Sequence, residues 1–247
     1  MLLLAFESLL SAQQARPRIT HTKYKLIDLG TLGGPVSYES PNGESNQILS
    51  DSGVIAFSAD TSIPDPNAPD FCFNPHPDGC FVTHATQWKQ GALTDLGALP
   101  GLNSSTAGAI NDRGWSVGFS QNGLFDPLIG VPVTTATFWK RDGIHDIGTL
   151  GGVWSLATGI TNDGKVVGMA TVDGSPDPFW ELIDAPWPSP THPFIWNQGK
   201  MIDLGTLGGP DALIAAGCVN QGLPVGSSFT SSTPDSNTGF PPMAPFA

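Results

Sequence analysis

The sequence has few charged residues, few cysteines and no long apolar run, and each shortage excludes a class of protein. Charged residues make up 13% of the 247-residue chain, about half the share of roughly 25% found in soluble domains. The ten Lys and Arg residues are spread along the chain, so we expect no nucleic-acid partner. No apolar stretch reaches about 18 residues, so no segment is expected to span a membrane. Three cysteines are too few for a disulfide-stapled scaffold.

Glycine, proline and aromatic residues are plentiful instead. The 30 Gly and 23 Pro residues form about a fifth of the chain, which excludes a helical bundle or coiled coil because those folds need many helix formers. Seven Trp and 13 Phe residues in a chain that is 39% hydrophobic exclude simple disorder. The net charge of −12 serves solubility. This composition predicts an all-β chain of short strands and glycine-marked turns.

The first twelve residues form a short apolar segment. Residues 1–12 (MLLLAFESLLSA) end in small residues, which is typical of the apolar core and cleavage zone of a secretory signal, although the basic start is missing. We interpret residues 1–20 as the remnant of a signal peptide or as a disordered N-terminus. The first interpretation predicts a secreted protein, extracellular or periplasmic.

Internal repetition organises the rest of the chain. The step Asp-Leu/Ile-Gly recurs four times, at Asp28, Asp95, Asp146 and Asp203. Thr-Leu-Gly-Gly follows in three copies, and Ala-Leu-Pro-Gly replaces it at 98–101. Each copy then carries an apolar residue, a polar turn and a glycine, as in Ile160 to Gly164 (ITNDG), and a second short apolar run. A strand containing Trp ends three of the copies, at Trp88, Trp139 and Trp196.

Each copy predicts four antiparallel strands. Glycine accepts the positive φ that tight strand reversals require, and the flanking runs are rich in Val, Ile, Phe, Trp and Thr. In the third copy the strands are expected near 155–161, 165–171, 192–197 and 200–204. The repeat units are expected at 21–94, with a long insert, and at 95–145, 146–202 and 203–247, the last one truncated.

Four strands in about 50 residues have the size of a propeller blade. The predicted fold is therefore an all-β, propeller-like array of about four four-stranded units, the last one incomplete, with a stacked β-solenoid as the competing architecture. The last unit stops at Phe246, about where its Trp strand should begin. We interpret the chain as a fragment of a longer array or as a four-blade ring that lacks one strand.

The recurring sequence elements described above resemble those of the bacterial extracellular HAF-type repeat family. The family's His-Ala-Phe element is matched loosely by His84 to Trp88 (HATQW), Thr135 to Trp139 (TATFW) and His192 to Trp196 (HPFIW). The resemblance covers about residues 24–247 and implies an extracellular β-repeat protein with no catalytic residues to carry over. The sequence departs from the pattern at Ala98, Pro100 and Thr135.

Variable inserts separate the repeated strands and are expected to emerge on one face, where loops on a rigid scaffold usually carry function. They lie at about 59–83, 121–134, 171–191 and 227–244. In the third insert, Phe179, Trp180 and Trp187 are interpreted as possible ligand contacts, with packing between blades as the alternative. The inserts are also acidic, but their spacing matches no calcium-loop pattern and their prolines favour a rigid solvated loop. We therefore predict no metal site.

The cysteines have two different predicted roles. Cys72 and Cys80 bracket a short loop, CFNPHPDGC, and are interpreted as a possible local disulfide in an oxidising compartment. A metal site with His76 would need more ligands than this loop offers. Cys218 stands in the column that Leu49, Ile110 and Ile160 occupy, so it is expected to be a small buried hydrophobic residue.

The recurring aspartates point to turn chemistry rather than to catalysis. An Asp before Leu-Gly is expected to accept a backbone N–H in the turn that follows. No Gly-x-Ser-x-Gly elbow or phosphate loop is present, and nothing in the sequence pairs two acids in one pocket. We therefore predict a secreted, non-catalytic scaffold without a cofactor. It would bind a polysaccharide, a cell-wall component or a protein through the insert loops. The alternatives are an extracellular glycoside-type hydrolase with acids on the inserts, and a purely structural or adhesive array.

Overall fold

The computed structural model describes residues 24–39, 47–101, 104–177, 187–219, 223–233 and 242–246, apart from the side chains of residues 215–219, 223 and 246. Within this part of the chain the regular structure is entirely β. The strands form four antiparallel sheets, three with four strands and one with three. In every sheet the order of the strands in space is their order in the sequence.

The bounds of the strands are as follows. The first sheet contains β1 (Gly33–Tyr38), β2 (Ile55–Pro64), β3 (Phe81–Lys89) and β4 (Ala92–Gly97). The second contains β5 (Ser105–Ile110), β6 (Ser116–Phe125), β7 (Pro132–Lys140) and β8 (Gly143–Asp146). The third contains β9 (Ser155–Ile160), β10 (Val166–Thr171), β11 (Thr191–Asn197) and β12 (Lys200–Asp203). The fourth contains β13 (Ala212–Val219), β14 (Leu223–Phe229) and β15 (Met243–Phe246).

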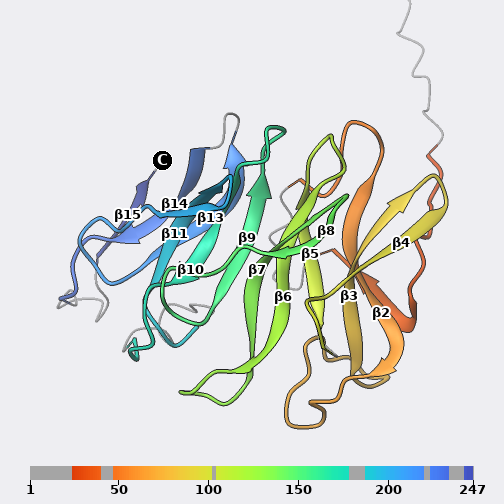
Figure 1. The fold of residues 1–247 in the computed structure, drawn as a ribbon, viewed down its shortest axis with the longest axis horizontal. Coiled ribbons are helices and arrows are strands. Elements are labelled where there is room, and N and C mark those ends of the chain that lie inside the picture. Colours follow the sequence, from red (N-terminus) through yellow and green to blue (C-terminus); the bar gives the residue numbers. More distant parts are fainter. Residues whose placement is uncertain are drawn as a thin grey trace, which may run out of the picture.

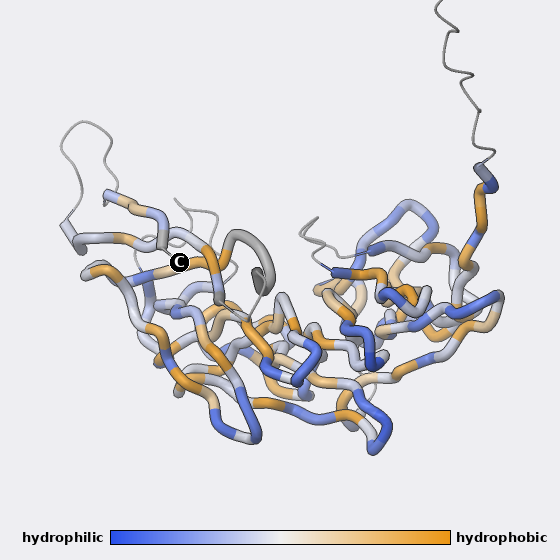
Figure 2. Tube along the Cα trace, turned by 90° about the horizontal axis from the view of Figure 1, so that it is seen from above, coloured by the Kyte–Doolittle hydropathy of each residue, from blue (hydrophilic) through white to orange (hydrophobic). Residues whose placement is uncertain are grey.

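The all-β fold of four-stranded repeat units is confirmed. The third sheet agrees with the predicted strands to within one residue at most boundaries, because its turns carry local glycine signals. The fourth sheet has three strands, and β15 pairs with β14 where the other sheets place their Trp strand. Figure 1 shows the four sheets following one another along the chain, and Figure 2 shows them in a curved row with the first and fourth sheets at its ends. Within the described part of the chain this row does not close into a propeller.

The hydrophobic core lies between successive sheets. Strands β5, β9 and β13, which begin the second, third and fourth sheets, each contact strands of the preceding sheet. One cluster joins the second and third sheets through Val117, Phe138, Ile160 and Phe194. A second cluster joins the first and second sheets through residues such as Ala85 and Trp139. Alanines in these strands are fully buried, so the sheets approach one another closely.

The recurring Asp-Leu/Ile-Gly step forms the predicted turn. In all four copies Oδ1 of the Asp accepts a hydrogen bond from the N–H of the Gly two residues later, at distances of 2.7 to 2.9 Å. These glycines have φ between 68° and 86°, a region that other residues rarely adopt. The prediction that the aspartates accept backbone N–H groups is therefore confirmed.

A serine at the start of a sheet joins that sheet to the preceding one. Ser155 Oγ accepts a hydrogen bond from the Ala136 N–H at 2.7 Å and donates one to the Gly148 carbonyl at 2.6 Å. At the preceding boundary Ser105 Oγ accepts from the Ala85 N–H at 2.9 Å and donates to the Gly97 carbonyl at 2.8 Å. Each hydroxyl therefore ties the third strand of one sheet to the Asp-Leu/Ile-Gly turn and to the next sheet.

Replacing this hydroxyl is expected to destabilise the fold. The substitution Ser155→Ala leaves the buried Ala136 N–H and the Gly148 carbonyl without their partner, which costs roughly 1–3 kcal/mol. Denaturant unfolding followed by Trp fluorescence measures this loss. The matched control is Ser232→Ala at an exposed position, where we expect a change within about 0.5 kcal/mol. Equal stability of the two variants would contradict the role of the Ser155 hydroxyl.

Candidate functional site

The antiparallel register gives the sheets two distinct ends. At the first, the turns after β5 and β9 lie beside the β3–β4, β7–β8 and β11–β12 hairpins. We call this the turn end. At the other, which we call the insert end, the long connections β2–β3, β6–β7 and β10–β11 emerge. The predicted ligand contacts belong to the insert end.

The first insert contains the predicted disulfide. Cys72 and Cys80 are bonded, with a sulfur–sulfur distance of 2.05 Å. Within this loop His76 packs parallel to Phe81, and its Nε2 lies 3.2 Å from Oδ2 of the fully buried Asp60. These contacts of His76 pack the first insert against β2 and β3. In the described residues no group of three or more His, Cys, Asp or Glu side chains is placed to hold a metal ion.

The predicted aromatic contacts of the third insert lie in two different places. Phe179 and Trp180 fall outside the described residues. Trp187 is only 3% exposed and stacks on Trp154, with ring centroids 6.1 Å apart. Its ring therefore packs in a core cluster with Val133, Leu156 and other residues and does not face solvent. Cys218 lies in β13, and its side chain is outside the described set.

A column of buried aspartates at the insert end escaped the sequence analysis. Asp65, Asp126 and Asp177 each precede a proline in their insert and are 2% to 4% exposed. Asp126 accepts hydrogen bonds from the Leu128 and Ile129 N–H groups and from the Trp154 indole N–H. The repeated dipeptide Asp-Pro was the signal that could have revealed this column. Asp126 thereby joins the second insert to Trp154 at the start of the third sheet, whereas the Asp65 carboxylate accepts hydrogen bonds from Asn67 within its own insert.

The third member of this column meets a second carboxyl group. Strand registers place Asp211 at the start of the fourth sheet where the third sheet has Trp154. Asp211 is 1% exposed, and its Oδ1 accepts the Thr191 N–H at 2.7 Å. Burial and the neighbouring Asp177 raise the pKa of Asp211 to about 7, against the opposing effect of the Thr191 N–H.

An open hollow lies at the turn end, between the first and second sheets. It is a groove of about 750 Å³. On one side Gln87, Lys89 and Thr94 line it from β3 and β4. On the other side lie the turn residues 112–115 and Arg141 from the β7–β8 hairpin. We call this hollow the turn-end groove.

The groove contains an aromatic ring, cations and the side-chain amide of Gln87. The Arg113 guanidinium carbon lies 5.0 Å from the centre of the Trp115 ring, a cation–π contact. Gln87 Nε2 donates hydrogen bonds to the Gly114 carbonyl and to Ser116 Oγ, at 3.0 and 2.9 Å. These bonds hold the first sheet against the turn of the second and fix the width of the groove.

The one acidic side chain in the groove is already engaged. The Asp112 carboxylate accepts the Asp51 N–H at 2.8 Å and the Asn162 side-chain amide at 2.7 Å. These two hydrogen bonds hold the pKa of Asp112 below its ordinary value. Asp112 is therefore an ionised structural group that links three neighbouring turns, and it is unsuited to donate a proton at neutral pH.

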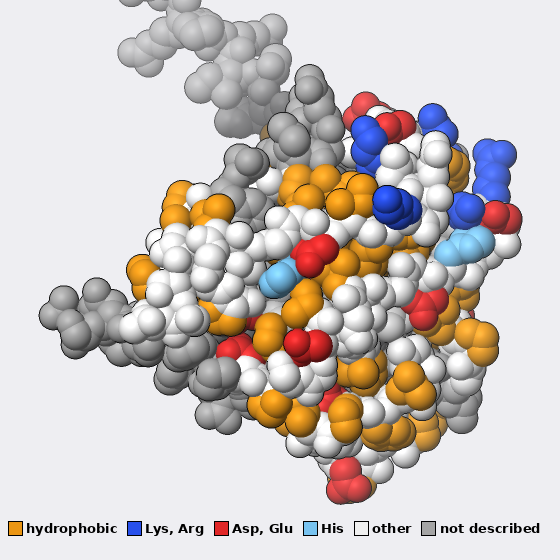
Figure 3. Space-filling view, turned by 60° about the vertical axis from the view of Figure 1, so that its left-hand side comes forward, with side chains coloured by type: hydrophobic (Ala, Val, Ile, Leu, Met, Phe, Trp, Pro, Cys, Tyr) orange, Lys and Arg blue, Asp and Glu red, His pale blue; other side chains and the backbone are white. Residues whose placement is uncertain are grey.

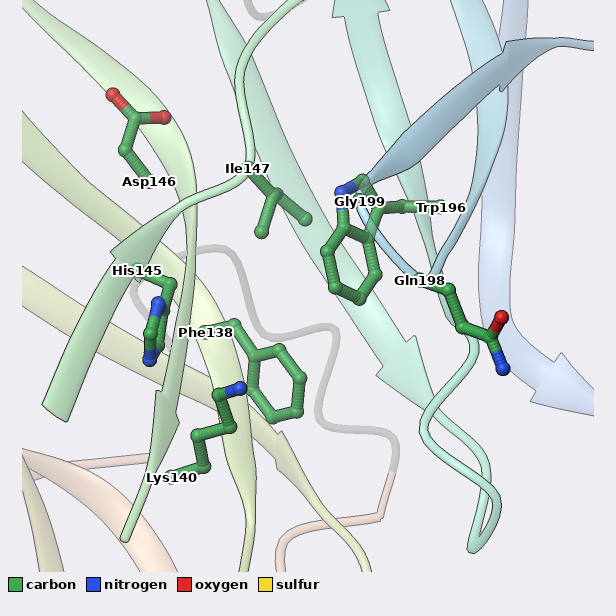
Figure 4. Close-up of a pocket in the computed structure, with 8 residues that line it drawn as sticks. All are labelled: Phe138, Lys140, His145, Asp146, Ile147, Trp196, Gln198 and Gly199. Carbon is green, nitrogen blue, oxygen red and sulfur yellow. The ribbon is translucent and has the colours of Figure 1, made fainter. Parts of the chain in front are cut away.

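A second, smaller hollow of about 400 Å³ lies between the second and third sheets. Figure 4 shows the Phe138 and Trp196 rings next to each other near its centre, with the Asp146 carboxylate directed away. The two rings have centroids 5.9 Å apart and meet edge to face. Lys140 and His145 complete the wall, and both contact Asp142, whose pKa the His145 hydrogen bond lowers.

The turn-end groove escaped the sequence analysis because its parts come from separate repeats. The signal that was present is a Lys directly after the Trp of a Trp strand, at Lys89 and Lys140, and an Arg-Gly-Trp step at Arg113. The groove offers hydrogen-bond donors, positive charge and an aromatic ring, which are binding elements. Its lining residues include no Ser, Cys or His arranged as a nucleophile and base.

Searches of family models, of curated proteins and of solved structures found no match to this chain. Among the described residues, no helix has the length and apolar character needed to cross a membrane.

The Asp177–Asp211 pair predicts a pH-dependent stability. The folded state keeps a proton on Asp211 up to about pH 7, whereas the unfolded chain loses it near the ordinary value of 3.8, so this group costs stability as the pH rises between these values. Asp211→Asn removes that cost. The variant is expected to be more stable than the wild type at pH 7.5, by up to about 1.4 kcal/mol for each unit by which the pKa is raised.

Denaturant unfolding at pH 3.5 and pH 7.5 measures the effect, and the gain should vanish at the lower pH. The control is Asp173→Asn in the same connection, because Asp173 is exposed and its hydrogen bonds with Ser175 lower its pKa. The control should gain nothing at pH 7.5. A gain for Asp211→Asn of equal size at both pH values would contradict the account in which the folded state keeps Asp211 protonated.

Proposed function

We propose that the protein is a secreted, non-catalytic β-repeat scaffold that binds a polysaccharide in the turn-end groove. The observation that carries this proposal is the groove itself. It combines the Trp115 ring with the side chains of Gln87, Arg113 and Arg141. Sugar rings present apolar faces and many hydroxyl groups, so aromatic faces beside polar donors are suited to them.

The arrangement of the two hollows favours a polymer over a small molecule. Arg141 lines the turn-end groove, and its neighbour Lys140 lines the smaller hollow. The β7–β8 hairpin therefore forms a wall that the two hollows share. Both are open to solvent and follow the repeat of the sheets. An extended chain of sugar residues could contact both, which a single small ligand could not do as readily.

The extracellular or periplasmic location is part of the proposal. The Cys72–Cys80 disulfide is consistent with an oxidising compartment. The resemblance of the repeats to the HAF-type family supports the same assignment. Binding through the insert loops, to a cell-wall component or a protein, stays a second possibility for Phe179 and Trp180. The turn end is preferred because its described side chains form a groove.

The hydrolase alternative finds weaker support. Glycoside hydrolysis needs two carboxyl groups that flank the sugar bond in an accessible site. Asp177 and Asp211 are neighbouring acids, but both side chains are at most 2% exposed, so a glycan could not reach them in this conformation. Asp112 in the groove is held ionised by two hydrogen bonds. These facts favour binding without catalysis.

Filling the groove tests the proposal. Thr94 is exposed, lines the groove and lies opposite Gln87 in the β3–β4 pair. Thr94→Trp is expected to abolish retention of the protein by polysaccharides in affinity electrophoresis, because the new ring occupies the space of the ligand. The panel should include polygalacturonate, dextran sulfate and dextran.

The matched control is Ile202→Trp. Ile202 lies opposite Ile195 in the β11–β12 pair, the register position that corresponds to Thr94, and it lines neither hollow. The control should bind as the wild type does, and both variants should keep the wild-type melting midpoint. If Thr94→Trp also binds as the wild type does, the groove is not the polysaccharide site. A purely structural or adhesive array would bind none of the panel.

A further inference from the structure

The positive charge of this acidic protein is concentrated at the turn end. Of the seven Lys and Arg residues in the described part of the chain, six lie in or beside the turns and hairpins there. These six are Lys89, Arg113, Lys140, Arg141, Lys165 and Lys200. On the face seen in Figure 3 the Lys and Arg side chains gather toward one edge, whereas Asp and Glu side chains are spread more widely.

The cations in the groove are available to a ligand. Lys140 and Lys165 form ion pairs with Asp142 and Asp163, each at 3.2 Å. The other four have no ion pair with another described residue. Three of these four line the turn-end groove: Lys89, Arg113 and Arg141.

Among the described residues that line the groove, one negative side chain balances these three cations. Asp112 lines the groove, but its carboxylate oxygens accept hydrogen bonds from Asp51 and Asn162 on the neighbouring turns. The lining therefore carries an excess of two positive charges. Cations held together repel one another unless an anion neutralises them. A neutral sugar can accept hydrogen bonds from these groups but leaves their positive charge uncompensated.

The insert end has the opposite character. Its three inserts at 59–83, 121–134 and 171–191 contain no Lys or Arg. They hold several aspartates instead, among them Asp70, Asp78 and Asp173. A charge separation of this kind repels a polyanion from one end and draws it to the other. The distribution therefore selects both the sign of the ligand and the end to which it binds.

We propose that the turn-end groove binds a glycan that carries anionic groups, either the carboxylates of uronic acids or sulfate esters. This inference rests on the proposed polysaccharide function. Arg113 and Arg141 would each present a planar guanidinium, which can form two parallel hydrogen bonds with a carboxylate or sulfate. Lys89 supplies a third charge on the facing sheet. Trp115 already contacts the Arg113 guanidinium and the Phe138 ring, and its remaining half-buried surface adds an apolar part to the groove wall.

The test is the affinity of the full chain for four polymers by isothermal titration calorimetry. Polygalacturonate carries carboxylates, dextran sulfate carries sulfate esters, dextran is neutral, and single-stranded poly(dT) is a polyanion without a glycan. The wild type is expected to bind one or both anionic glycans at least about tenfold more tightly than dextran or poly(dT). Preference between polygalacturonate and dextran sulfate identifies the anionic group. Rising NaCl should weaken the binding.

Removing charge from the groove should remove the binding. Arg113→Gln combined with Arg141→Gln is expected to lower the affinity for the preferred anionic glycan at least about tenfold and to weaken its dependence on NaCl. Lys200→Gln is the matched control, because Lys200 is exposed at the same end and does not line the groove. The control should change the affinity less than about twofold. Melting curves verify that the variants are folded.

The outcomes separate the two proposals. Equal binding of dextran and the anionic glycans, with no loss in the double variant, would overturn the charge-based inference and leave the polysaccharide function intact. Equal binding of poly(dT) and the anionic glycans would overturn the assignment to glycans in favour of an unspecific polyanion surface. Binding of none of the polymers would overturn the proposed function itself.

Discussion

At two boundaries between sheets, the hydrogen bonds of a serine hydroxyl hold the sheets at the close spacing on which the rest of this structure depends. At two successive boundaries, Ser105 and Ser155 each accept a backbone N–H from the preceding sheet and donate to the glycine carbonyl of an Asp-Leu/Ile-Gly turn. A side chain as short as serine can do this only where the backbones of adjacent sheets nearly touch. That closeness demands small residues in the facing strands, and Ala85, Ala107 and Ala136 are indeed fully buried. At the other end of the strands, Asp112 joins the turns of neighbouring sheets by accepting hydrogen bonds from Asp51 and Asn162.

At the boundary between the third and fourth sheets, both the serine and the residue that donates the N–H are replaced. The strand registers place Ala212 where the serine stands elsewhere, and Pro193 where the donating N–H stands. Because Ala212 has no hydroxyl and Pro193 has no N–H, both partners of this hydrogen bond are absent at this boundary and neither is left unpaired. Asp211 takes over by accepting the Thr191 N–H, the role that Ser104 has for Thr83 at the first boundary. The buried Asp177–Asp211 pair is thus a consequence of a joint made from different residues.

The sequence predicted the strands well but neither the burial of Trp187 nor the turn-end groove, for physical reasons. Turns such as 161–164 are fixed by local glycine and Asp chemistry, so the strands of the third sheet follow from the residues beside them. The surroundings of Trp187 depend on Trp154, which is distant in sequence, and no local pattern reports that contact. The turn-end groove likewise depends on residues that are distant in the sequence. Lys89, Arg113 and Arg141 belong to three different turns, and only the packing of one sheet on the next brings their charges together.

We therefore propose the turn end as the binding face, in place of the insert loops that the sequence suggested. The most direct measurement is an NMR titration of the ¹⁵N-labelled chain with a galacturonic acid trisaccharide. Binding in the groove should shift the indole N–H signal of Trp115 and the guanidinium N–H signals of Arg113 and Arg141, and leave the amides of the insert residues Leu128 and Ile129 unchanged. Shifts confined to the insert residues, with the Trp115 and arginine signals unmoved, would contradict it.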